Sequence, residues 1–94
     1  MEPGRQFKRL YHRTSAEAAE KIHTDGEFIS REYTGDVYAS NRLHGQAEGY
    51  GDAVVRLRVP SHLAHLDDEF PGGEKHYRIN RKDIKPEHII RPKK

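Results

Sequence analysis

The clearest pattern along the chain is the strict alternation of residues 53–59, which is typical of a half-buried β-strand. One face of this strand would carry Ala53, Val55, Leu57 and Val59, and the other Val54, Arg56 and Arg58. Pro60 cannot donate a hydrogen bond to a sheet and marks the predicted end. Shorter patterns predict strands at 7–12, 37–40 and 75–79, and a short closing strand near 89–90.

Residues 14–26 predict the one clear helix. Thr14 is the expected N-cap, and Glu17 three residues later completes a capping box, so the helix would begin at Ser15. Gly26 supplies the left-handed residue that ends it. Its narrow apolar stripe consists of Ala18, Ala19 and Ile22.

The remaining segments are predicted as turns, loops and core edge. Gly35-Asp36 would form a turn, and the glycine-rich segment after 40 a loop with at most a short helix from about Asn41. Residues 61–66 would be extended, 67–69 an acidic turn and 71–73 a loop. Pro86 bars a regular helix near the end, where Ile84, Ile89 and Ile90 are expected to close the core edge. These elements predict an α+β fold with a small, largely antiparallel β-sheet and one main N-terminal helix.

Size and composition narrow this picture. A chain of 94 residues supports one core, so we expect a single domain over 1–94, with its core at about 7–90 and a basic tail at 91–94. Hydrophobic residues make up 33% and charged residues 34%, which implies a thin core. The polar start and the lack of a long apolar run predict neither signal peptide nor membrane span. With no cysteine, a cytoplasmic setting fits best, including delivery into a target cell as part of a longer protein.

Positive charge gathers toward the end of the chain, although the net charge is only +2. Two interpretations stay open for this basic stretch and for Arg56 and Arg58: a solvated surface, or contact with phosphate groups or nucleic acid. The seven histidines show no metal-ligand spacing. No phosphate-binding glycine loop, zinc signature or Ser-His-Asp arrangement can be assembled.

Five motifs follow one another in the order LYHRTS, AAEKI, GDVYAS, GYG and VVRLRV. In this order the chain, from about Leu10 to Ile90, resembles the ADP-ribosyltransferase superfamily, in particular the small bacterial toxin-like members with a His-Tyr-acid triad. The resemblance implies an ADP-ribosyltransferase-like fold, NAD as substrate and no metal. It also implies a neutralising immunity or antitoxin protein as partner. The acceptor could be protein, nucleic acid, a small molecule or water.

The resemblance assigns roles to residues of the first strand and helix start. His12 would hydrogen-bond the ribose next to nicotinamide, and Thr14 and Ser15 would hold the amide group. Arg13 stands where many relatives carry glycine. Judged from the residues alone, His12 could instead satisfy a neighbouring carbonyl at a strand end.

The resemblance also assigns roles in the later segments. Tyr38, which shares a face with Ser40, would stack on the nicotinamide ring, although it could equally pack in the core. Tyr50 lies between two glycines, an arrangement that suits either close approach to a ligand or a plain turn. The third residue of the triad would be Glu74 or, in closer alignment, His76. Earlier candidates for the acid are Asp67, Asp68 and Glu69.

These residue types suit the cleavage of a glycosidic bond, because a fixed carboxylate stabilises the positive charge that develops on the ribose. If His76 replaces the acid, that stabilisation is lost, and the chain would be a non-catalytic nucleotide-binding module. A third hypothesis is an RNA-directed toxin or ribonuclease that uses His12, His76 and the basic surface. The sequence therefore leaves three functions to compare, with ADP-ribosyl transfer favoured by the order of its motifs.

Overall fold

The computed structural model describes residues 6–28, 35–45, 49 and 51–91. Within them the elements are β1 (Phe7–Thr14), α1 (Ala16–Asp25), β2 (Asp36–Ser40), β3 (Ala53–Pro60), β4 (His65–Glu69), β5 (Lys75–Asn80) and β6 (Ile89–Ile90), with four short 3-10 turns after β3. The described strands form one six-stranded sheet in the order β4-β5-β2-β1-β3-β6, and neighbouring strands in it are antiparallel. The α+β class and the antiparallel sheet are confirmed.

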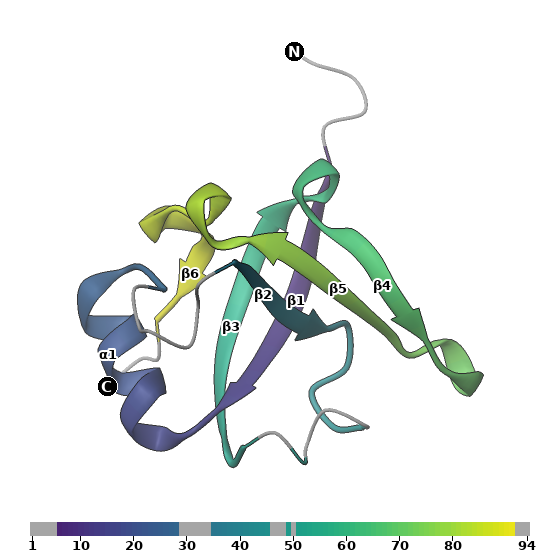
Figure 1. The fold of residues 1–94 in the computed structure, drawn as a ribbon, viewed down its shortest axis with the longest axis horizontal. Helices are drawn as coiled ribbons and strands as arrows, with labels where there is room; N and C mark the ends of the chain where they lie inside the picture. The colour runs from purple at the N-terminus through teal and green to yellow at the C-terminus, as the bar shows by residue number, and fades with distance from the viewer. Residues whose placement is uncertain (1–5, 29–34, 46–48, 50, 92–94) are drawn as a thin grey trace.

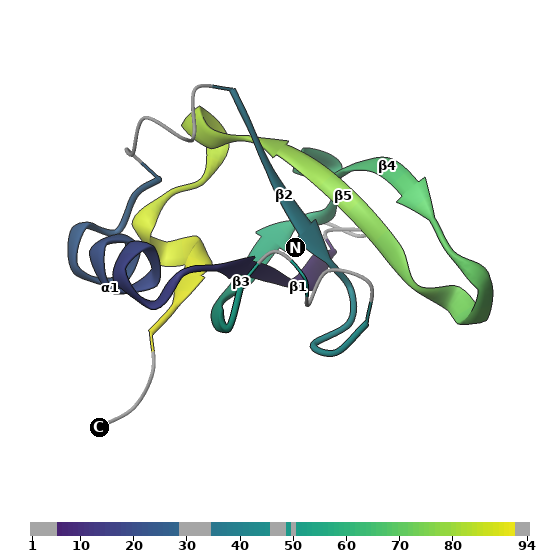
Figure 2. The ribbon, with the colours of Figure 1, turned by 60° about the horizontal axis from the view of Figure 1, so that its bottom comes forward.

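The sheet is bent into two layers, because β2, β5 and β4 lie across β1 and β3 (Figures 1 and 2). The inner faces of the two layers meet in one hydrophobic core, which also takes up Ile22 of α1 and Phe28. The ammonium group of Lys8 on β1 lies 5.2 Å from the centre of the Tyr77 ring on β5, so these two side chains meet across the layers. The buried hydrophobic residues of the strands are Leu10, Val37, Ala39, Val55, Leu57, Val59, Tyr77, Ile79 and Ile89.

The start of α1 differs from the prediction by one residue. Thr14 is not the N-cap: it is the last residue of β1 and pairs with Ala53 of β3. The cap is Ser15, whose hydroxyl accepts a hydrogen bond from the Ala18 N–H at 3.1 Å. The prediction was wrong because β3 offers β1 a partner beyond His12, which local sequence does not reveal. The predicted end is confirmed, since Gly26 is left-handed with φ 72°.

Two further expectations were wrong because of strand pairing. The acidic segment 67–69 is part of β4, which pairs with β5. The register of this pairing shifts between Leu66 and Asp68. Ile84 and Ile89 are buried, but Ile90 is 40% exposed, because alternate residues of β6 face opposite sides. The described residues 41–45 contain no helix.

Candidate active site

His12 lies on the inner face of β1 and is 7% exposed. Its Nδ1–H donates a 2.7 Å hydrogen bond to the backbone carbonyl of Tyr38, and its ring packs edge-on against Phe28 at 5.2 Å. Tyr11 of β1 pairs with Ser40 of β2, and the hydrogen bond from His12 to Tyr38 is a second link between these two strands. His12 thus satisfies a neighbouring carbonyl, which is one of the two interpretations left open by the sequence, although β1 continues past it to Thr14. In its neutral form the ring then carries the lone pair on Nε2.

Tyr38 presents its side chain on the outer face of β2, where it is 55% exposed. The neighbouring Val37 and Ala39 point into the core, so the side chains of His12 and Tyr38 lie on opposite faces of the sheet. The structure therefore joins these two predicted site residues through the Tyr38 backbone. Ser40 shares the alternation of Tyr38 but is buried, and its hydroxyl accepts a 3.0 Å hydrogen bond from the Arg42 N–H.

Glu74 and His76 form a hydrogen-bonded pair at the start of β5, in which Glu74 is buried and His76 is partly buried. Glu74 is 7% exposed, and its Oε2 lies 2.7 Å from Nε2 of His76. His76 stands directly opposite Ser40 on the outer face, and its ring lies 4.7 Å from that of Phe70. Because a carboxylate oxygen accepts, the Nε2–H of His76 is the donor in this hydrogen bond.

The loop after β2 is tied to the turn between β4 and β5. The side-chain amide of Asn41 donates to the Gly73 carbonyl at 3.1 Å and accepts from the Lys75 N–H at 2.8 Å, and its own N–H donates to the Lys75 carbonyl at 3.0 Å. The guanidinium of Arg42 donates to the Gly72 carbonyl. These bonds hold the loop over the segment that contains Glu74.

Gly45, in the loop after β2, lies directly against the Glu74 carboxylate. A Cβ placed on Gly45 would lie 2.8 Å from Cδ and 2.9 Å from Oε2 of Glu74, and closer still to Oε1. Only glycine permits that approach without displacing the carboxylate. The Glu74 carboxylate therefore packs between the backbone of the loop at Gly45 and the His76 ring.

The other residues assigned by the resemblance have structural contacts in the described chain. Arg13 reaches the loop after β2, where its Nη2 donates to the Leu43 carbonyl and lies 3.4 Å from Nδ1 of His44. Thr14 is buried at the end of β1, and Ser15 caps α1. Tyr50 lies outside the described residues.

The earlier candidates for the acid lie on β4. Asp67, Asp68 and Glu69 are exposed, and Asp67 makes a 3.9 Å ion pair with Arg78. Of the acidic candidates, Glu74 is the buried one, so it has the environment that most strengthens an electrostatic interaction.

Three residues that shape the site were not singled out from the sequence. Gly45, Asn41 and Phe70 hold or cover the Glu74–His76 pair. The sequence signals were a glycine and an asparagine in the loop after a predicted strand, which are common in turns and thus not specific.

Comparisons with known proteins do not assign this chain to a family. No family model, no curated protein and no solved structure matches it. The described residues contain no group of three or more His, Cys, Asp or Glu side chains placed to hold a metal ion. They also contain no helix of the length and apolarity that crossing a membrane requires.

Proposed function

We propose that this protein cleaves NAD at the bond between ribose and nicotinamide and transfers the ADP-ribose to an acceptor or to water. The observation that supports this most is the buried Glu74 carboxylate, held by His76 on the side of the sheet where Tyr38 is exposed. Departure of nicotinamide takes the bonding electron pair to its ring nitrogen and leaves positive charge on the ribose. A carboxylate already fixed in place stabilises that charge without reorganisation.

Tyr38 is the residue that would bind the nicotinamide ring. Its exposed aromatic face is available for stacking, and His76 lies diagonally across from it on β5, a separation of about 7–8 Å that long side chains bridge. Arg78 stands directly opposite Tyr38 and is held by long ion pairs of 3.8 Å to Asp36 and 3.9 Å to Asp67. Such weak pairs leave its guanidinium able to bind the diphosphate of NAD.

His12 has a positioning role in this proposal. Its hydrogen bond fixes the backbone of Tyr38 from the inner side of the sheet, so it acts on the bound ring through Tyr38. His12→Ala should therefore raise KM for NAD more than it lowers kcat. His12→Gln keeps an N–H donor, and a partial return of KM at equal thermal stability would distinguish positioning from a general loss of structure.

The test is nicotinamide release from NAD, followed by chromatography, for the wild type and matched variants. Glu74→Gln should lower kcat about 10²–10³-fold, the usual size of losing one charge-stabilising group. Glu69→Gln, an exposed carboxylate on β4, is the control and should leave kcat unchanged.

The outcomes separate the competing functions. No release by the wild type, with NAD binding still detected by calorimetry, would support the non-catalytic binding module. If the wild type shows no nicotinamide release and no NAD binding, the proposal is overturned. A ribonuclease that uses His12 and His76 as a pair gains no support, because these side chains lie on opposite faces of the sheet and do not converge on one phosphodiester. A neutralising partner protein remains a prediction, and it would cover the exposed Tyr38.

A further inference from the structure

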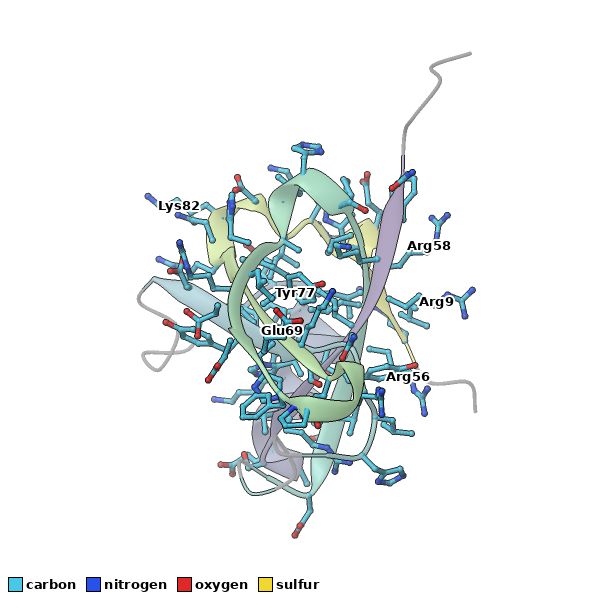
Figure 3. The ribbon with its side chains drawn as sticks, turned by 90° about the vertical axis from the view of Figure 1, so that its right-hand side faces the viewer. Arg9, Arg56, Arg58, Glu69, Tyr77 and Lys82 are labelled. Carbon is cyan, nitrogen blue, oxygen red and sulfur yellow. The ribbon has the colours of Figure 1, made fainter. Side chains whose placement is uncertain are left out.

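A second surface, on the other layer, collects arginine and aromatic side chains. We call the outer residues Phe7, Arg9 and Tyr11 of β1 and Arg56 and Arg58 of β3 the arginine face. Arg9 stands directly opposite Arg58, and Tyr11 directly opposite Arg56. Figure 3 shows Arg9, Arg56 and Arg58 projecting to the same side, away from β4 and β5.

The arginine face has no compensating negative charge on its own strands. β1, β3 and β6 contain no aspartate or glutamate. Among the described residues no ion pair involves Arg9, Arg56 or Arg58, whereas Arg78 on the other layer faces two carboxylates. Like charges directly opposite each other on a sheet reduce stability, so the Arg9–Arg58 pair is unfavourable in the isolated domain. A bound anion would remove this repulsion.

Aromatic rings hold two of these arginines. The guanidinium carbon of Arg58 lies 4.1 Å from the centre of the Phe7 ring, and that of Arg56 lies 5.6 Å from the centre of the Tyr11 ring. Phe7 is 38% exposed and Tyr11 is partly exposed. Guanidinium groups and rings side by side supply both kinds of contact that unpaired nucleotides use, namely charge for the phosphates and planar surfaces for the bases.

We propose that the arginine face binds single-stranded nucleic acid. Arg56 and Arg58 are two residues apart on β3, about 7 Å along the strand, and Arg9 extends the row onto β1. A two-stranded platform of this size holds a few nucleotides. It also suits an unpaired strand, whose bases can reach the rings, better than a duplex, whose bases are stacked inside. This proposal is independent of NAD chemistry, and its test uses no NAD.

The experiment measures fluorescence anisotropy of a labelled oligouridylate of about 12 nucleotides, titrated with the full chain at several salt concentrations. Three phosphate contacts predict that log K falls with log salt with a slope of about −2. The variant Arg9→Gln/Arg56→Gln/Arg58→Gln should bind at least tenfold more weakly and show a slope near zero. The control Lys21→Gln/Lys82→Gln/Lys85→Gln removes the same charge from exposed positions elsewhere and should change affinity less than about twofold.

Further arms make the result decisive. Replacing the same three arginines by lysine keeps the charge, so the salt slope should return while affinity stays below wild type, because lysine lacks the planar group. A DNA oligonucleotide of equal length tests whether the 2′-hydroxyl contributes. Circular dichroism melts should show that both glutamine variants are folded.

Several results would overturn the proposal. The first is no binding by the wild type at low salt. The second is an equal loss of affinity in the Arg→Gln variant and in the Lys→Gln control. The third is tighter binding to a duplex of the same length. Binding to vesicles of anionic lipid without binding to the oligonucleotide would also overturn it and point to a membrane surface instead.

Discussion

The substitution Gly45→Ala tests whether the Glu74 carboxylate is wedged against the loop. The new Cβ would lie 2.8 Å from Cδ and 2.9 Å from Oε2 of Glu74, whereas ordinary contact begins at 3.4 Å. The carboxylate must shift, which disturbs its 2.7 Å hydrogen bond to His76. Overpacking of this kind costs about 1–3 kcal/mol, which for a domain of this size lowers Tm by about 5–20 °C.

The assay is thermal denaturation followed by circular dichroism at one pH. Gly35→Ala is the matched control, because a Cβ there meets no atom within 4 Å, and it should change stability by less than about 0.5 kcal/mol. In a Glu74→Ala background the clash is gone, so the cost of Gly45→Ala should fall below about 0.5 kcal/mol. The reasoning is refuted if Gly45→Ala is as stable as Gly35→Ala, or if its cost is unchanged when Glu74 is removed.

Three other perturbations test the rest of the fold. Ser15→Ala removes the cap of α1 and should lower the free energy of unfolding in urea by about 0.5–2 kcal/mol. Gly51→Ala would place a Cβ against the backbone of Thr14, which cannot rotate away as a side chain can. The Tm of this variant should therefore fall further than that of Gly35→Ala. Burial, and secondly repulsion from Arg91, lower the pKa of His23 below its ordinary value of 6.5. The unfolded chain therefore binds more protons in acid, so this group costs no stability above about pH 6.5 and reduces stability as the pH falls toward the lowered folded pKa. Arg91→Gln should lessen that acid loss without abolishing it, as measured by urea denaturation at about pH 5 and pH 7.5, and an unchanged loss would contradict the contribution of Arg91.

Local signals predicted most elements of the fold but not where two of them begin or end. The alternation at 53–59 and the left-handed Gly26 depend on neighbouring residues, and both predictions are confirmed. The cap at Thr14 and the turn at 67–69 were wrong, because each of these segments pairs with a strand distant in the sequence. Ladder hydrogen bonds with such a strand outweigh weak local preferences.

The candidate site shows the same division. The resemblance pointed to Tyr38 as the residue that would bind the ring and to Glu74 or His76 as the third residue of the triad. The sequence could not show that Glu74 is buried against Gly45, because the hydrogen bonds of the Asn41 side chain hold these two segments together.

By itself, then, the sequence determined which segments alternate and where the helix ends. Only the tertiary structure decided that His12 and Tyr38 face opposite sides of one sheet, and that Arg9 joins Arg56 and Arg58 on a single face. The physical reason is that strand pairing and the bend of the sheet depend on contacts between residues far apart in the chain, which no local pattern records.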